Sequence, residues 1–161
     1  MTRSDDAKIQ WTGDETGAWT GLVRSGQGLL QSVETALKVS GLPPLAWYDV
    51  LWELEKARPN GLRLNDLGAR VLLDKYNVTR LVTRLEKEGL ARRRGCTGDG
   101  RGVFALITPK GARLRKRMWP VYSRAVREGF FSRLSPGETA SLRKLLGRVS
   151  GENGKSAAKS D

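Results

Sequence analysis

The chain has 161 residues, of which 39% are hydrophobic, and this is enough for one domain with a buried core. Its formal net charge of +12 favours a negatively charged partner. No apolar run approaches the roughly 18 residues of a membrane helix and the polar N-terminus lacks a signal peptide, so we expect a cytoplasmic protein without a membrane partner. The chain has one cysteine, Cys96, and therefore cannot form an internal disulfide. It has no histidine, so it lacks the commonest general base and a usual zinc ligand, and we expect neither a metal nor a cofactor.

The first predicted elements are two helices that follow a flexible arm. Residues 1–17 are polar and rich in Gly, Thr and Asp, which predicts the arm. Between residues 18 and 40, apolar side chains recur at spacings of three and four, which predicts an amphipathic helix. The stretch GLPP at residues 41–44 ends this helix. A second helix, apolar on both faces and therefore buried, is predicted for residues 45–56.

Two further helices are predicted in close succession. We expect a short helix from Asn65, which is placed to cap it, to about Leu72. A longer helix follows, capped by Asp74 and ended by Gly89, and its interior-facing residues are Val78, Leu81, Val82 and Leu85. Because a tight turn joins the two, they predict a helix-turn-helix.

The stretch RRRGCTGDGRG at residues 92–102 allows two interpretations, a phosphate-binding glycine loop or the tip of a β-hairpin. A dinucleotide-binding loop needs a strand before its glycines and a helix directly after them. Here residues 103–108 (VFALIT) have strand propensity, residues 90–94 are long enough to pair with them, and no GK[ST] follows. We therefore expect a hairpin with the glycines at its tip.

The C-terminal part is predicted to contain two more helices and a disordered tail. Thr108 and Pro109 start a long helix, with a kink expected at Pro120. Residues 135–138 (SPGE) form a capping box with proline at the first helical position, and apolar spacing continues that helix to residue 149. The polar residues 150–161 predict the tail.

Positive charge is concentrated in the centre of the chain. Residues 1–73 carry a net charge of −1, whereas residues 74–118 carry 13 Lys and Arg against 4 Asp and Glu. A basic stretch beside a neutral remainder is typical of nucleic-acid binders. The alternative is a solvated basic surface that maintains solubility.

The order of these elements, with the stretches YDVLWELE, VTRLVTRLEKEGLARRR and ALITPKGARL, resembles the MarR family of winged-helix transcriptional regulators across residues 18–149. The resemblance implies a mainly α fold with a small β-hairpin wing (α+β). Residues 43–108 would form a winged helix-turn-helix lobe, and residues 18–42 and 109–149 a helical dimerisation region. It also implies an obligate homodimer on a pseudo-palindromic site in double-stranded DNA, with recognition helices in successive major grooves and wings at the flanking minor grooves.

The candidate base-reading residues lie on the second helix of the helix-turn-helix. Polar side chains in the N-terminal half of such a helix reach base edges, while its dipole favours phosphate. This description fits Lys75, Tyr76, Asn77, Thr79, Arg80, Thr83 and Arg84. The alternative is a solvated helix face.

The wing candidates are Arg94, Asp99 and Arg101. Residues 99–101 match the first three positions of the family's Asp-x-Arg-Arg wing element, and Gly102 replaces the last arginine. Side chains alternate across a strand, so the three arginines at 92–94 cannot all touch DNA.

Aromatic residues indicate an effector site between the dimer helices and the DNA-binding lobe, where members of the family bind effectors. We expect a small aromatic or anionic molecule to contact Trp19, Trp47, Asp49, Trp52, Arg80, Trp119 and Tyr122. Asp49 and Arg80, with Trp11 or Trp19 and an arginine of residues 92–94, resemble the Trp/Asp/Arg/Arg set of the family's urate-responsive subgroup. Core packing of the aromatic side chains is the alternative.

We expect a ligand-responsive, sequence-specific DNA-binding transcriptional regulator, with repression preferred over activation. One alternative is an architectural protein that uses the basic stretch without reading sequence. An enzyme is not expected, because the candidate carboxylates Glu53 and Glu55 lie on different faces of a helix.

Overall fold

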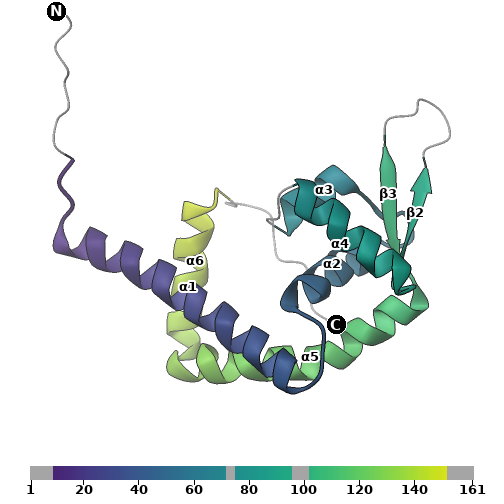
Figure 1. The fold of residues 1–161 in the computed structure, drawn as a ribbon. Helices are drawn as coiled ribbons and strands as arrows, with labels where there is room; N and C mark the ends of the chain where they lie inside the picture. Colours follow the sequence, from purple (N-terminus) through teal and green to yellow (C-terminus); the bar gives the residue numbers. More distant parts are fainter. Residues whose placement is uncertain (1–8, 72–74, 96–101, 152–161) are drawn as a thin grey trace, which may run out of the picture.

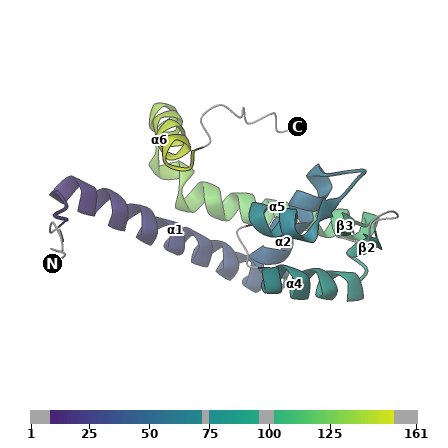
Figure 2. The same cartoon turned by 90° about the horizontal axis from the view of Figure 1, so that it is seen from above.

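The computed structural model describes residues 9–71, 75–95 and 102–151. It consists of a winged lobe, on the right of Figure 1, and a helical part in which α1, α5 and α6 extend to the left. The view from above in Figure 2 shows α1 running alongside α5, with α6 on the far side of α5. Among the described helices, none is long and apolar enough to cross a membrane.

Helix α1 (Gly13–Val39) begins five residues before the expected start near residue 18. Its N-cap is Thr12, whose side chain accepts from the amide of Glu15, while the Glu15 carboxylate accepts from the amide of Thr12. This reciprocal capping box satisfies two terminal donors. Residues 13–17 therefore belong to the helix and not to the predicted arm, because capping starts a helix even where its first turn has no apolar face.

The lobe is built from three helices and three strands. They are α2 (Leu45–Lys56), β1 (Leu62–Arg63), α3 (Leu64–Arg70), α4 (Lys75–Lys87), β2 (Ala91–Gly95) and β3 (Val103–Ile107). Its core contains fully buried side chains from the three helices, among them Leu51, Leu54, Leu67, Val78, Val82 and Leu85. Each such leucine stabilises the fold by about 1.5–3 kcal/mol relative to an exposed one.

The two paired strands of the predicted hairpin are confirmed and belong to a larger sheet, while residues 96–101 at its predicted tip lie outside the described residues. The strand order is β1-β3-β2, with both pairs antiparallel. Strand β1 was not predicted, because two residues are too few to show an alternating pattern. Gly61 precedes it with a φ of 76°, and a Cβ there would lie 2.3 Å from the carbonyl oxygen of Ala105, so only glycine fits.

The boundaries of the helix-turn-helix differ in detail from the sequence expectation. Arg63, and not Asn65, is the N-cap of α3, because pairing with β3 holds Arg63 extended and the helix begins directly after it. Asp74, the predicted cap of α4, lies outside the described residues. Gly89 ends α4 as predicted, with a φ of 69°.

Helix α5 (Pro109–Gly129) connects the lobe to the helical part. Thr108 caps it, its side chain accepting from the amide of Gly111, and Pro120 lies inside it. A second core, made by Val33, Leu37, Leu45, Tyr48 and Met118, joins α1, α2 and α5. The 3-10 turn η1 (Phe131–Arg133) and α6 (Pro136–Val149) complete the fold. The predicted capping box of Ser135 and Glu138 starts α6, which has no buried residue.

Candidate nucleic-acid interface

Helix α4 has one buried and one exposed face. Val78, Val82 and Leu85 are fully buried in the lobe core, as the spacing of three and four predicts. Asn77, Arg80 and Arg84 are exposed. The two arginines are four residues apart and therefore lie on one side of the helix, where a groove of DNA could meet both. Lys75 and Tyr76 belong to the first turn of α4, but their side chains lie outside the description.

Two polar side chains of α4, Thr83 and Arg84, contact other parts of the lobe. The Thr83 hydroxyl donates to the carbonyl of Thr79 at 2.8 Å and accepts from Arg93 Nη2 at 2.7 Å. The guanidinium of Arg84 lies 5.7 Å from the ring centroid of Trp47, within cation–π range. Thr83 is thus engaged by the wing strand and Arg84 by α2.

The three arginines of β2 have three different environments. Arg93 faces α4 and bonds Glu86, with Nη1 2.6 Å from Oε2. Arg94 points the other way, where Nη2 donates to the carbonyl of Asn60 at 2.8 Å. Arg92 is exposed. The alternation predicted from the strand is confirmed.

The sequence expectation missed Arg63, which lies at the base of the wing. Arg63 and Arg94 pair with Phe104 from the two strands that flank β3, and their guanidinium carbons lie 5.5 and 5.7 Å from its ring centroid. Two positive charges thus flank one aromatic ring on one face of the sheet. No sequence signal placed Arg63 there, since β1 was not recognisable. Asp99 and Arg101, the other wing candidates, lie outside the described residues.

The aromatic residues of the predicted effector site divide into separate groups. Tyr122 stacks on Tyr48 at 4.7 Å and on Trp119 at 5.7 Å between ring centroids. The other tryptophans have other partners: Trp52 contacts Arg115 and Lys56, Trp47 contacts Arg84, and Trp19 contacts Trp11. Within the single chain, no described hydrogen bond, ion pair or ring contact joins Trp19, Asp49 and Arg80. The described contacts thus divide these aromatic residues among separate partners, and a shared effector site stays a prediction.

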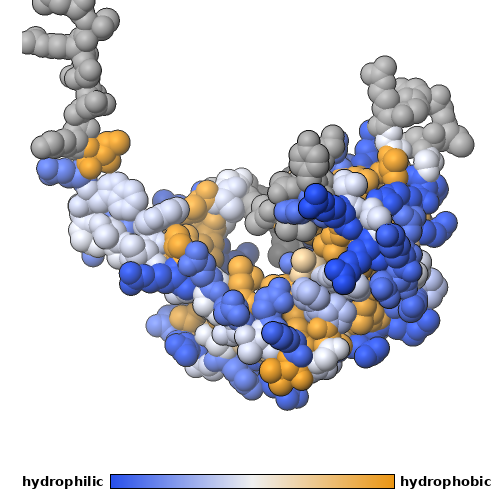
Figure 3. All heavy atoms as spheres, in the orientation of Figure 1, coloured by the Kyte–Doolittle hydropathy of each residue, from blue (hydrophilic) through white to orange (hydrophobic). Residues whose placement is uncertain are grey.

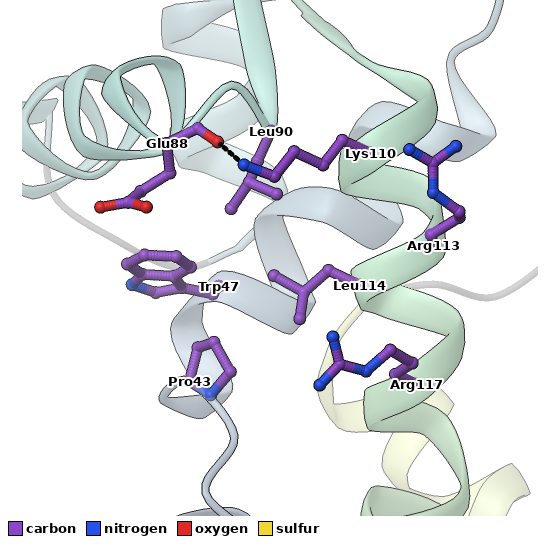
Figure 4. Close-up of a pocket in the computed structure, with 8 residues that line it drawn as sticks. All are labelled: Pro43, Trp47, Glu88, Leu90, Lys110, Arg113, Leu114 and Arg117. Atoms are coloured by element: carbon purple, nitrogen blue, oxygen red, sulfur yellow. Dashed lines mark hydrogen bonds between the residues drawn. The ribbon is translucent and has the colours of Figure 1, made fainter.

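An open groove does lie beside Trp47, with a volume of about 480 Å³. Figure 4 shows the Trp47 ring on one side and the side chains of α5 on the other. The lining residues are Pro43, Trp47, Glu88, Leu90, Lys110, Arg113, Leu114 and Arg117. Lys110 Nζ donates to the carbonyl of Glu88 at 2.7 Å, which closes one end. The groove combines an aromatic wall with three cationic side chains.

Asp49 occupies the junction of α1, α2 and α5. Its burial raises the pKa to about 6, and the nearby carboxylates of Glu53 and Glu34 contribute to the rise. Glu34 also accepts from the backbone amide of Leu45, the first residue of α2. Burial likewise raises the pKa of Tyr122, which faces the Asp49 charge.

Known proteins share both this sequence pattern and this fold. A MarR family sequence model matches residues 40–102. The DNA-bound crystal structure of Sco3205, a MarR family transcriptional regulator from Streptomyces coelicolor, gives a TM-score of 0.81 at 27% identity, covering 95% of each chain. AbsC, a MarR family regulator from the same organism, gives a TM-score of 0.79 at 28% identity, covering 89% of this chain and 97% of its own. In sequence over residues 40–102, and in fold over nearly the whole chain, the protein is similar to MarR family transcriptional regulators.

Sequence similarity to the MarR family is concentrated in the lobe. YkoM, an uncharacterized HTH-type transcriptional regulator of Bacillus subtilis (strain 168), is 34% identical over 84 residues, which are 52% of this chain and 54% of YkoM. The chain thus matches about half the length of this curated relative. The sequence model ends at residue 102, before α5 and α6, whereas the structural matches include nearly the whole chain. The fold resemblance and the α+β class expected from the sequence are confirmed.

Proposed function

We propose that this protein is a sequence-specific transcriptional regulator that binds double-stranded DNA as a homodimer and acts as a repressor. The observation that carries the proposal is the exposed face of α4, with Asn77, Arg80 and Arg84, beside a wing whose base displays Arg63 and Arg94. Figure 3 shows hydrophilic side chains over this part of the lobe. The DNA complex of Sco3205, whose fold this chain shares, supports the same assignment.

Two kinds of contact with DNA follow from this geometry. In the proposal α4 enters the major groove, where arginine reads guanine and asparagine reads adenine by paired hydrogen bonds. The other predicted base-reading candidates on this helix are Lys75, Tyr76, Thr79 and Thr83. The wing, with Arg94, Asp99 and Arg101, reaches the minor groove, where arginine senses width and negative potential. Arg63 joins the wing residues as a phosphate-binding candidate.

Selection of bound fragments from a random duplex pool tests sequence-specific binding. A dimer with one recognition helix per subunit should enrich a pseudo-palindrome whose half-sites lie about one helical turn, roughly 10 base pairs, apart. Arg80→Ala should weaken binding to the enriched duplex by about 1–3 kcal/mol and relax preference at one base pair. A pool that remains random after selection would contradict the proposal.

The dimer is supported by apolar side chains that the described part of the chain leaves uncovered. Six large hydrophobic residues on α1 and α6 are between 38% and 78% exposed: Trp19, Leu22, Leu30, Leu145, Leu146 and Val149. Figure 3 shows hydrophobic side chains at the surface in this region, next to the hollow between α1 and the lobe. Light scattering should give twice the chain mass of 17.8 kDa. A mass of one chain at micromolar concentration would exclude the dimer.

The groove beside Trp47 is the site proposed for a small aromatic or anionic effector. Its indole wall offers stacking and its three cations offer charge pairing, and Trp47 also contacts Arg84 of α4. A ligand that displaces the indole would therefore weaken DNA binding. Salicylate and related aromatic carboxylates serve as probes, with tryptophan fluorescence and DNA anisotropy as readouts. Arg113→Gln should weaken the response, and Arg127→Gln, a matched loss of charge on α5 outside the groove, should not.

A further inference from the structure

Arg93 makes a dense set of contacts between the wing strand and α4. Its Nη1 donates to Glu86 Oε2 at 2.6 Å and its backbone amide donates to Glu86 Oε1 at 3.1 Å. Its Nη2 donates to the Thr83 hydroxyl at 2.7 Å and lies 3.3 Å from the Thr79 carbonyl oxygen. The Arg93 side chain is 27% exposed, so water screens these contacts only in part.

We propose that Arg93 is a positioning residue: it fixes the angle between α4 and the wing, and thereby sets how well the protein distinguishes one DNA sequence from another. The inference rests on the DNA-binding function proposed above. It assigns Arg93 and Glu86 a role in specificity without contact to DNA.

The placement of the contacts explains why one side chain has this effect. Thr79, Thr83 and Glu86 follow each other at spacings of four and three, so they form one row along α4. Seven residues of helix rise by about 10 Å, and Arg93 spans that row from the strand. The chain itself joins α4 to β2 only at the end of the helix, through residues 88–90. The Arg93 bridge adds directed hydrogen bonds to the apolar packing between α4 and β2, which has no preferred direction.

The chemistry of the cluster requires arginine at this position. A planar guanidinium reaches a carboxylate and a hydroxyl in two directions at once, whereas an ammonium group has no fixed fork. The Thr83 hydroxyl accepts from Arg93 and donates to Thr79, which uses its one proton inside the cluster. Thr83 therefore serves this bridge, and base reading falls to Asn77, Arg80 and Arg84 on the exposed face.

Two pairs of variants separate positioning from charge. Arg93→Lys keeps the charge and breaks the fork, and Arg92→Lys makes the same change on the opposite face of β2. Glu86→Ala removes the acceptor, and Glu128→Ala removes an equal charge from the exposed surface of α5, outside the groove and the lobe. The measured quantity is the ratio of dissociation constants for a scrambled duplex and for the duplex that the parent chain selects.

We expect Arg93→Lys and Glu86→Ala to lower this ratio about tenfold, and both controls to leave it unchanged. The Glu86 variant is the sharper test, because losing a negative charge should by itself tighten binding to every duplex. If Glu86→Ala tightens binding equally on both duplexes, or if Arg93→Lys keeps the parent ratio, the positioning role is excluded. Ile107→Val, which loosens the lobe core, should lower the melting temperature without changing the ratio.

A measurement without DNA tests the bridge independently of the proposed function. The amide of Arg93 should exchange its hydrogen faster in Glu86→Ala than in the parent, and at the parent rate in Glu128→Ala. Unchanged exchange would show that the bridge does not hold β2. A parent chain that binds both duplexes equally would instead contradict the proposed function, and with it the effect on discrimination, while exchange still reports on the bridge.

Discussion

The winged lobe and the helical part differ in how completely one chain buries their apolar side chains. In the lobe, Leu54, Leu67 and Leu85 are fully buried. In the helical part, Leu30 on α1 and Leu145 on α6 are 57% and 54% exposed. The lobe therefore closes its core within one chain. The far ends of α1 and α6 have apolar faces that the described residues leave exposed, and a second copy is the occupant proposed above.

The largest expected effect concerns the closed core of the lobe. Leu54→Ala should lower the free energy of unfolding by about 2–5 kcal/mol, since it removes a buried side chain and leaves a cavity. Urea titration, monitored by circular dichroism, measures this change in the free energy of unfolding. A loss below about 1 kcal/mol would show that the lobe core is less tightly packed than its burial indicates.

The next effect concerns the open faces of the helical part. The double variant Leu145→Asp and Leu146→Asp places two charges on the exposed apolar face of α6, so it should dissociate the proposed dimer while the lobe stays folded. Sedimentation measures the mass, and Val103→Asp, on the exposed wing strand, should keep the parent mass. An unchanged mass in the α6 variant would place the subunit contact elsewhere.

At the junction between the two parts, Asp49 should make stability depend on pH. Its pKa is raised to about 6, so the native state resists its ionisation, and the parent loses stability as pH rises from about 4 to 6. Asp49→Asn should therefore stabilise by about 1–2 kcal/mol above pH 6, allowing for partial solvent screening, and by much less at pH 4. Thermal melts across this range measure the difference. An equal gain at both pH values would contradict the assignment to Asp49.

The smallest effect is expected at the far end of α1. Thr12→Ala removes the capping box and should destabilise the first turns locally by about 0.5–1 kcal/mol. Because these turns lie far from either core, amide exchange at Glu15 should rise while the melting temperature stays close to that of the parent. A large drop in melting temperature would show that the first turns of α1 unfold together with the core, and the two parts would then form one cooperative unit.

Local signals in the sequence were sufficient for much of the fold. Apolar spacing predicted the face of α4 that carries Val78 and Val82, Gly89 predicted its end, and Ser135 with Glu138 predicted the start of α6. These features depend on residues that are close together in the sequence, within about one turn of helix, so they can be recognised without the tertiary structure. The same kind of signal at Thr12 and Glu15 was present and overlooked, because the first turn of α1 has no apolar residue.

Tertiary structure decided which side chains meet. Strand β1 exists because β3 supplies its partner, so neither the cap at Arg63 nor the placement of Arg63 beside Phe104 could be predicted from local sequence. The alternation along residues 92–94 showed that the three arginine side chains cannot all face the same way. Only the packing of β2 against α4 determined that Arg93 bonds to Glu86. Likewise, spacing along the chain did not show that Trp47 contacts Arg84 of α4 while Trp52 contacts Arg115 of α5. Contacts between elements depend on distances across the fold, and residue spacing along the chain does not determine those distances.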